Sequence, residues 1–414
     1  GKWGLGNAGT TGDPAIKGFD AFTGYTNQVE AHFYYGDSID KIIHGKTEKV
    51  VVSPGEYTYD IAMRDALEFI RKNKDNKFFA YLPVRLPHAE YLAPENDMQL
   101  YLDESGQSIF EETPFPGDGH YAAQAFPNAA YAAMVSLIDK DIGIIVDLLK
   151  ELEIEESTLL FFTSDNGATN GLGHTTGYFT SNGPLRGQKG TLYEGGIRVP
   201  MIVWGPERVS AGRICDHKWA MWDLFPTFSE LAGKPIPADI DGITATNLIL
   251  NKGKTTEHDH LYWEYGTPWL TLFVQTVIKG EWKLVKVNRN IESVQYELYN
   301  LNDDISESEN LVEAHPQKVA ELDELIVQSH SKPELSEFDY SYLPDAMPVP
   351  PDQLYTETGK KGGLTGEYFT GTDFNKTIKK QTDPAIWFQW GHNPQDGLPE
   401  DQFSVRWTGQ LMAK

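Results

Sequence analysis

Apolar residues recur at helical spacing in two long stretches, and these stretches predict the main helices of the chain. Residues 57–72 carry Ile61, Leu67 and Ile70 on the apolar side of an amphipathic pattern. A stronger apolar series at helical spacing lies within residues 128–151 and has these members: Tyr131, Val135, Ile138, Ile142, Ile145 and Leu149. Both stretches are therefore expected to pack one face of a helix against a core.

Short, continuous apolar runs lie between the helical patterns and predict buried strands. These runs are residues 77–84, 158–163 and 199–204, each bounded by polar residues, Gly or Pro. A further helical pattern covers 219–232, with Gly233 placed to cap its carboxyl end. Strands that alternate with helices favour an α/β fold with a mostly parallel, doubly wound sheet flanked by helices.

The pattern changes at about residue 258. Lys279-Gly280 is typical of a hairpin turn, and a helix at about 315–330 follows the strands. Short strands are expected at 260–265, 270–278, 282–287 and 296–300. This order indicates a small antiparallel α+β subdomain.

The chain is therefore expected to contain several parts. Prolines and polar residues dominate the stretch after 330, a composition that is typical of a linker. The last fifty or so residues are instead rich in Gly and aromatic residues. The expected parts are a catalytic α/β domain at 1–257, the antiparallel subdomain at 258–330, a linker at 331–362 and a partial β module at 363–414.

Composition excludes several classes of function. The 414 residues include 35 Lys and Arg against 60 Asp and Glu, a net charge of −25, which argues against nucleic acid or anionic lipid as partner. No apolar run is long enough to predict a membrane span. Cys215 is the single cysteine, so the sequence offers neither a disulfide nor a cysteine-rich zinc site, and we interpret Cys215 as structural.

The predicted strand at 158–163 runs directly into Ser164-Asp165-Asn166-Gly167. Sites in open α/β sheets form beyond the carboxyl ends of strands, and a carboxylate beside an amide offers the oxygen ligands that Ca²⁺ or Mg²⁺ prefers. The alternative is an ordinary turn, because Asp, Asn and Gly all favour turns.

Two further features could bind an anion. Lys189 lies between glycines in the segment 186–196, where Gly allows close approach of a ligand, although a solvated loop would look the same. His88 follows the predicted strand at 77–84 and could move a proton, although a single His is more often structural.

The order of these motifs resembles that of the type I sulfatases, in the alkaline-phosphatase-like superfamily. The matching segments include GKWGLG at 1–6, FFAYLPVRLPH at 78–88, LLFFTSDNGAT at 159–169, NGPLRGQKGTLYEGGIRVPMIVWGP at 182–206 and YELYNLNDDISESENL at 296–311. The resemblance covers about residues 1–330. It implies that the N-terminal part of the family domain is missing from this sequence.

The resemblance also implies roles for individual residues. Asp165 and Asn166 correspond to ligands of an active-site Ca²⁺, for which Mg²⁺ is an alternative. Lys2 and Lys189 correspond to the lysines that hold the sulfate and the leaving-group oxygen, and His88 to the His that assists the leaving alcohol. Such a set would neutralise the sulfate oxygens and protonate the departing alkoxide.

One position departs from the family pattern. Many members carry His where this chain has Gly4, and that His is thought to help break down the sulfated enzyme intermediate. We hypothesise that His32 replaces it. Gln28 and His174 are expected to contact the substrate.

The nucleophile of the family has no counterpart in this sequence. Type I sulfatases use a formylglycine made from the Cys or Ser of a C/S-x-P-x-R segment, and no such segment occurs here. We expect the formylglycine on a missing N-terminal segment, and this stretch alone to be inactive.

The tail shows a second resemblance. GLTGEYFTGTDF at 363–374 and LPEDQFSVRWTG at 398–409 are similar to the opening of a protective-antigen-type β domain, a family that often binds glycans.

The combined expectation is a periplasmic or extracellular sulfatase that removes sulfate from a sulfated carbohydrate. Two alternatives stay open from the sequence. One is a phosphoester or phosphonate hydrolase of the same superfamily, which could use the same metal and lysines. The other is a glycan-binding protein whose sulfatase domain has lost catalysis, a reading that Gly4 and the missing nucleophile motivate.

Overall fold

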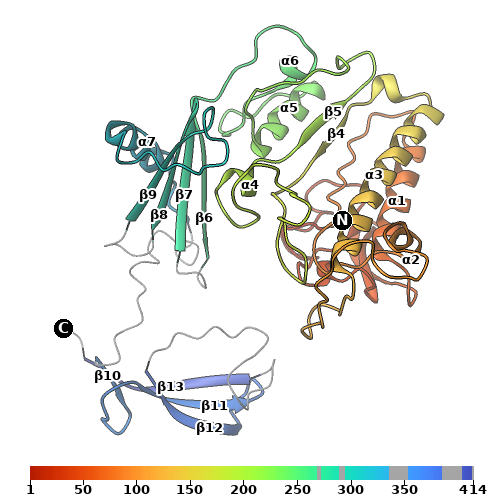
Figure 1. The fold of residues 1–414 in the computed structure, drawn as a ribbon. Coiled ribbons are helices and arrows are strands. Elements are labelled where there is room, and N and C mark those ends of the chain that lie inside the picture. Colours follow the sequence, from red (N-terminus) through yellow and green to blue (C-terminus); the bar gives the residue numbers. More distant parts are fainter. Residues whose placement is uncertain (268–271, 289–293, 335–352, 385–402, 413–414) are drawn as a thin grey trace. The chain divides into compact units, whose positions relative to one another are not determined.

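The computed structural model describes most of the chain, and the described residues fall into two compact units (Figure 1). The first unit comprises residues 1–183 and 198–258, and the second comprises 184–197 and the described residues from 259 onwards. The described stretches are 1–267, 272–288, 294–334, 353–384 and 403–412.

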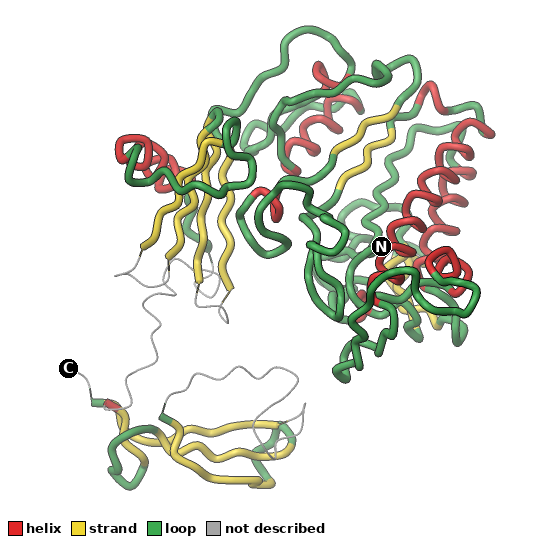
Figure 2. Tube along the Cα trace, in the orientation of Figure 1, coloured by secondary structure: helices red, strands yellow, loops and turns green. Residues whose placement is uncertain are grey.

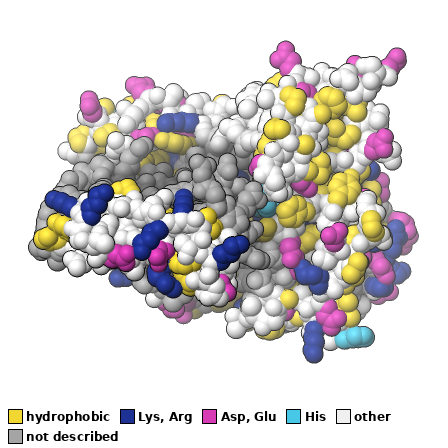
Figure 3. All heavy atoms as spheres, turned by 90° about the horizontal axis from the view of Figure 1, so that it is seen from below, with side chains coloured by type: hydrophobic (Ala, Val, Ile, Leu, Met, Phe, Trp, Pro, Cys, Tyr) yellow, Lys and Arg dark blue, Asp and Glu magenta, His cyan; other side chains and the backbone are white. Residues whose placement is uncertain are grey.

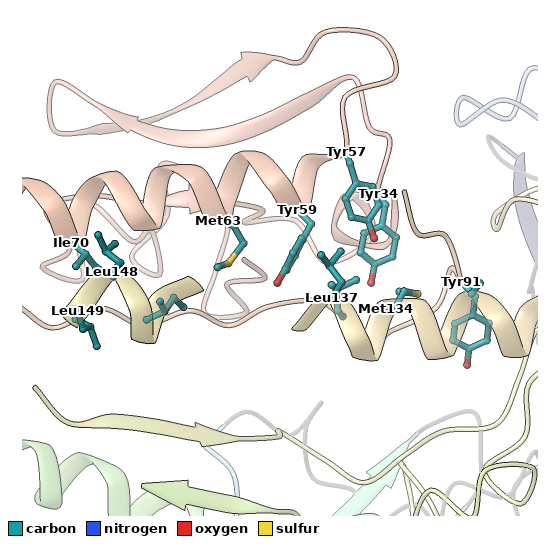
Figure 4. Close-up of a cluster of buried hydrophobic side chains, with 13 residues drawn as sticks. Tyr34, Tyr57, Tyr59, Met63, Ile70, Tyr91, Met134, Leu137, Leu148 and Leu149 are labelled. Atoms are coloured by element: carbon teal, nitrogen blue, oxygen red, sulfur yellow. The ribbon is translucent and has the colours of Figure 1, made fainter. Parts of the chain in front are cut away.

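The first unit is built around two helices, α1 (Thr58–Lys72) and α3 (Pro127–Glu151), at the positions that the apolar spacing predicts. Met63 and Ile70 of α1 share one buried cluster with Met134 and Leu137 of α3, and Tyr34, Tyr57 and Tyr91 join it from loops (Figure 4). The helical predictions for this region are confirmed.

The buried face of α3 differs in part from the predicted one. Ala129, Ala130, Ala133 and Met134 are fully buried, whereas Val135, which we expected to face the core, is 42% exposed. The prediction counted large apolar residues only. Alanines allow the closest approach of a neighbouring segment, so the packed face follows them rather than Val135.

The strands of the first unit differ from the expected parallel sheet. β4 (Leu160–Thr163) pairs with β5 (Met201–Trp204), but the pairing is antiparallel. Residues 78–84 form no strand, although Phe78 and Leu82 pack on the core and Phe79 and Tyr81 are exposed. The side chains thus alternate as in a strand, but this stretch has no ladder partner among the described residues. The fold class is nevertheless a mixed α/β one.

Smaller elements complete the first unit. β2 (Ser38–Ile43) and β3 (Lys46–Val51) form a hairpin that the sequence reading missed, and β1 (Thr23–Gly24) pairs with β2. The predicted helix at 219–232 is α5 (Leu224–Leu231), which ends at Gly233 with a positive φ of 68°. The other short helices of this unit are η1 (Glu30–His32), α2 (Glu95–Met98), η2 (Gln99–Tyr101), η3 (Glu155–Ser157), η4 (Met221–Asp223) and α6 (Thr246–Ile249).

The carboxyl end of α5 confirms the predicted cap. The N–H of Lys234 donates to Ser229 O at 2.8 Å, and that of Gly233 donates to Glu230 O at 2.9 Å. This pair of bonds satisfies carbonyls that the end of a helix leaves without intrahelical donors.

The second unit contains the predicted antiparallel subdomain. Its sheet has the order β6 (Leu261–Thr267), β7 (Leu272–Lys279), β8 (Trp282–Asn288) and β9 (Val294–Asn300), and α7 (Pro316–Ser329) packs on it. Gly280 forms the predicted hairpin turn with a φ of 59°. The short helix α4 (Glu194–Ile197) also belongs to this unit, whereas the predicted catalytic domain at 1–257 includes it.

The tail forms a separate sheet with the order β10 (Leu354–Thr356), β13 (Phe403–Leu411), β11 (Leu364–Thr370) and β12 (Lys376–Asp383), drawn as strands in Figure 2. β10 lies inside the predicted linker but pairs with β13, so the linker prediction is wrong at this end.

Basic and acidic side chains both appear on the face of the protein that is seen in Figure 3. Of the helices in the described residues, none is sufficiently long and apolar to span a bilayer.

The packing of α3 predicts a contrast between neighbouring residues. Met134→Ala should lower the free energy of unfolding by about 2–5 kcal/mol, because it opens a cavity in the core. Val135→Ala should change it by less than about 1 kcal/mol, because Val135 is 42% exposed. Urea unfolding of both variants measures the difference. Equal losses would contradict the burial of Met134 and the exposure of Val135 on which the prediction rests.

Candidate active site

Two predicted site residues meet in one cluster of aromatic rings. The imidazole of His32, at the end of η1, stacks on that of His88 with ring centroids 5.0 Å apart. His32 Nδ1 lies 3.0 Å from His120 Nε2 and 3.2 Å from the Tyr121 hydroxyl. The structure therefore joins His32 and His88, which are far apart in the sequence, with two residues that sequence reasoning missed.

A buried arginine holds the segments that carry His32 and His88. Arg85 Nη1 donates to Ala31 O at 2.8 Å and to Phe33 O at 3.0 Å, the carbonyls on either side of His32. Its guanidinium carbon also lies 4.6 Å from the ring centres of both Tyr25 and Tyr34. Because Arg85 precedes His88 by only three residues, one side chain fixes both segments.

Hydrogen bonds of the backbone of His88 fix the turn in which this residue lies. The His88 N–H donates to Arg85 O at 2.8 Å, and the Tyr34 hydroxyl donates to His88 O at 3.0 Å. His88 Nδ1 contacts Ala89 O, and because a carbonyl oxygen can only accept a hydrogen bond, this contact favours the tautomer with the proton on Nδ1. In the neutral ring the lone pair then lies on Nε2, which is the nitrogen able to exchange a proton with a ligand.

Carboxylates hold the loop that carries His120 and Tyr121. Asp118 Oδ1 accepts from the N–H of His120 at 3.0 Å and from that of Tyr121 at 2.7 Å. The buried Glu90 accepts from Ala122 N–H at 3.0 Å. No periodic pattern marks this loop in the sequence. The only signal was the His-Tyr pair just after two glycines.

Lys2, Gly4 and Gln28 belong to the same unit. The N–H of Lys2 donates to Pro83 O at 3.0 Å, so Lys2 lies beside the extended stretch that leads to His88. Gly4 has a φ of 102°, and a Cβ added there would lie 3.6 Å from the side-chain nitrogen of Gln28. A His at position 4 would therefore have a strained backbone, which gives a physical reason for the departure from the family pattern.

Asp165 and Asn166 lie just beyond the carboxyl end of β4, separated from it by Ser164, as predicted. Asn166 donates through its side-chain nitrogen to Gly167 O at 3.0 Å, and Ser164 Oγ donates to Asn166 O at 2.8 Å. Partial burial raises the pKa of Tyr81, and the negative charge of Asp165 adds to this shift.

The donor chemistry at Asp165 and Asn166 fits a hard cation but supplies only part of a ligand set. A carboxylate and an amide oxygen are ligands that Ca²⁺ accepts, and Ca²⁺ takes six to eight oxygens. In the described part of the chain, no group of three or more His, Cys, Asp and Glu side chains is arranged to hold a metal.

Lys189 lies in the second unit, within residues 184–197. It sits in a tight turn in which the N–H of Thr191 donates to Gln188 O at 3.0 Å and the Thr191 hydroxyl donates to the same oxygen at 2.8 Å. Gly187 and Gly190 on its two sides both have a φ of 84°. The glycine-rich pattern therefore serves a closed turn.

His174 does not join the cluster. It is 1% exposed, stacks on Tyr131 at 4.0 Å between ring centroids, and its Nδ1 lies 2.8 Å from Asn128 Oδ1. Burial lowers the pKa of His174. A side chain in this position packs in the interior, so we leave His174 out of the proposed site. Cys215, which we interpreted as structural, is exposed.

Comparison with protein families shows to which family the chain belongs. Residues 1–234 match the family model described as Sulfatase, which is more than half of the 414 residues. The chain belongs to the sulfatase family. Residues 187–332 also match the model described as N-sulphoglucosamine sulphohydrolase, C-terminal.

Several sulfatases are similar to the chain over part of their length. N-acetylgalactosamine-6-sulfatase of Canis lupus familiaris is 32% identical over 211 residues, which is 50% of this chain and 35% of that protein. A sulfatase of Formosa agariphila is 28% identical over 264 residues, or 59% of this chain and 44% of that protein. The chain thus spans less than half the length of these two relatives.

Solved structures support the fold. The crystal structure of Ps i-CgsB in complex with k-i-k-neocarrahexaose superposes with a TM-score of 0.63 at 24% identity, covering 79% of this chain and 69% of the other. The structure of BT4656 in complex with its substrate D-Glucosamine-2-N, 6-O-disulfate gives 0.56 at 18% identity, covering 78% and 77%. The mixed α/β fold is thus the alkaline-phosphatase-like fold that the sequence resemblance implied.

The buried arginine of this sulfatase chain generates a stability prediction. Arg85→Met should lower the free energy of unfolding by about 2–3 kcal/mol, because it leaves buried carbonyls without a charged donor. Arg71→Met is the matched control, since Arg71 pairs with Glu151 on the surface at 2.7 Å. The control should cost under about 1 kcal/mol. Chemical unfolding measures both, and equal effects would remove Arg85 from its proposed structural role.

The buried His174 generates a pH prediction. In the described residues, its Nε2 has no hydrogen-bond partner, so protonation would bury an unpaired N–H. Its folded pKa lies below the ordinary value of 6.5, so the unfolded chain binds the proton more tightly and acid favours unfolding.

The free energy of unfolding should therefore fall from about pH 7 to about pH 5, and His174→Gln should reduce that fall. Unfolding curves at stepped pH measure it. His44→Gln, at an exposed turn position, is the control and should leave the slope as in the parent protein. A slope that His174→Gln leaves intact would contradict the assignment.

Proposed function

We propose that the full-length protein hydrolyses sulfate esters of carbohydrates. The observation that carries this proposal is the stacked pair His32 and His88, held by Arg85 in a chain that belongs to the sulfatase family. The cationic side chains that we assign to the site would attract an anion at short range. The net charge of the whole chain, −25, therefore does not oppose the binding of an anion there.

His88 is the proposed general acid for the leaving alcohol. Its Nδ1 is engaged with Ala89 O, so Nε2 exchanges the proton. Lys2 and Lys189 are the proposed cations that neutralise the sulfate oxygens and the leaving-group oxygen. Charge that develops in the transition state is stabilised best by such fixed groups.

His32 is the residue that we propose would move a proton during sulfate release, in place of a His at position 4. Its Nδ1 is hydrogen-bonded to His120 and lies close to the Tyr121 hydroxyl, which orients the ring. A second group that holds a base in one orientation is a recurring requirement of proton transfer. Gln28, beside Gly4, is proposed to contact the substrate.

Asp165 and Asn166 are the proposed residues for a Ca²⁺ ion, with Mg²⁺ as the alternative. A bound divalent cation would polarise the sulfate and offset its negative charge. The nucleophile is proposed to be the formylglycine that the family resemblance implies, in a segment with no counterpart in this sequence.

The names of relatives support a carbohydrate substrate. One relative is an N-acetylgalactosamine-6-sulfatase, and one structural neighbour is bound to a disulfated glucosamine described as its substrate. We propose a periplasmic or extracellular location, where sulfated polysaccharides occur. The glycan-binding role of the tail stays a prediction.

The direct test incubates the full-length protein with a panel of sulfated oligosaccharides and measures released inorganic sulfate. His88→Ala should lower kcat by about 100-fold or more, because the leaving alkoxide loses its proton donor. His315→Ala, at the start of α7, is the control and should retain activity. Release of phosphate from phosphate esters in place of sulfate would overturn the proposal and favour the phosphoester alternative.

The metal is tested in the same preparation by thermal unfolding with Ca²⁺ or with a chelator. Ca²⁺ should raise the unfolding temperature of the parent protein and have little effect on Asp165→Ala. Asp239→Ala, at an exposed position, should respond as the parent does. A full response of Asp165→Ala would place the metal elsewhere.

A further inference from the structure

The turn that carries Lys189 is fastened to the C-terminal sheet on both of its sides. Residues 184–197 belong to the same compact unit as the β6–β9 sheet rather than to the unit that precedes and follows them in sequence. The family model for the C-terminal region begins at residue 187, within this segment. Two independent observations thus group the Lys189 turn with the C-terminal subdomain.

The first attachment lies just before Lys189. Arg186 Nη1 donates to the Tyr299 hydroxyl at 2.7 Å and to Glu307 O at 2.9 Å. The guanidinium also stacks on the Tyr193 ring, 3.9 Å from its centre. Glu297 accepts from the hydroxyl of Tyr299 at 2.6 Å and from that of Tyr193 at 2.9 Å.

The second attachment lies just after Lys189. Lys283 of β8 is fully buried, and its Nζ lies 2.9 Å from Glu194 Oε1 and 2.8 Å from Glu307 Oε1. The N–H of Glu194 donates to Glu307 Oε2 at 2.7 Å. A buried ion cluster of this kind is directional, because each charged group must keep its partners or lie unpaired in the interior.

The segment between the two attachments is closed on itself. The N–H of Gly195 donates to Arg186 O at 2.7 Å. A Cβ at Gly195 would come within 2.6 Å of that oxygen, and one at Gly196 within 2.1 Å of Thr191 O. The backbone therefore has little room to shift between its anchors, and the turn at Lys189 inherits their position.

We propose that Tyr299, Lys283 and Glu307 are positioning residues for the sulfate-binding Lys189, so that the C-terminal sheet sets the geometry of a catalytic cation. This inference rests on the proposed function of Lys189. It assigns to β8 and β9 a role in substrate binding through the turn, without contact between those strands and the substrate. A purely structural subdomain would stabilise the protein without affecting how Lys189 acts.

The test compares two tyrosines of β9 that each donate a hydroxyl to a carboxylate. Tyr299→Phe removes the bond from Arg186, and Tyr296→Phe, whose hydroxyl donates to Asp323 at 3.0 Å, is the matched control. In hydrogen exchange of the full-length protein, Tyr299→Phe should speed exchange of amides in 187–195 by about fivefold, as the loss of one hydrogen bond implies. The control should leave these amides unchanged.

Kinetics separate positioning from stability. Tyr299→Phe should lower kcat/KM for a sulfate ester, and Tyr296→Phe should not. In a Lys189→Ala background the Tyr299→Phe change should cost no more than about twofold further, because its effect passes through Lys189. Should Tyr299→Phe fail to fold, Glu297→Gln, which weakens the same attachment, replaces it.

Two results would overturn the inference. One is exchange in 187–195 that is equal in Tyr299→Phe and Tyr296→Phe. The other is an unchanged penalty of Tyr299→Phe when Lys189 is already Ala. If the parent protein releases no sulfate, the proposed function fails, and the exchange experiment still decides whether the anchor holds the turn.

Discussion

The proposed site of the first unit depends on one buried guanidinium. Arg85 binds the carbonyls on both sides of His32 and stands three residues before His88, so it links the two segments that carry the imidazoles. Its third donor, Nη2, reaches Thr58 Oγ1 at 2.6 Å, at the start of α1. The helix that builds the core and the segments that carry His32 and His88 are thereby tied to one planar group. Lysine could not replace it, because a single ammonium lacks the fixed fork of donors that these separate acceptors need.

Local patterns predicted what local forces determine. The helices α1, α3 and α7 and the hairpin at Gly280 follow from apolar spacing and turn chemistry, which act between near neighbours in sequence. The direction in which β4 and β5 pair could not be predicted from local patterns, because strand direction depends on which segments become partners. His120 and Tyr121 were missed for a related reason. Their loop has no periodicity, and contacts with residues far away in sequence, such as that of Ala122 with Glu90, bring it to His32.

The burial of Lys283 also could not be predicted from the sequence pattern. A lysine in a short strand of a hairpin, such as Lys283 in β8, is usually expected at an exposed position. The side chain of Lys283 is nevertheless fully buried. Its partner Glu194 lies 89 residues away in sequence, inside a segment that sequence order alone assigns to the preceding domain. The family resemblance identified Lys189 from its motif. It could not reveal that the fixed geometry of that motif comes from β8 and β9, since only the folded contacts contain this information.

Arg85 and Lys283 bury a cation in two different ways, and the difference matters for function. Arg85 is neutralised mainly by carbonyl dipoles and aromatic faces, whereas Lys283 faces two carboxylates, one of which, Glu307, has its pKa raised by burial despite the nearby ammonium. An apolar cluster could hold the Lys189 turn as firmly as this ion cluster does. It would not fix the turn in one register, because apolar contacts are not directional. The proposed role of Lys189, which is to meet a small anion, needs that register, so positioning explains the ionic anchor better than stability does.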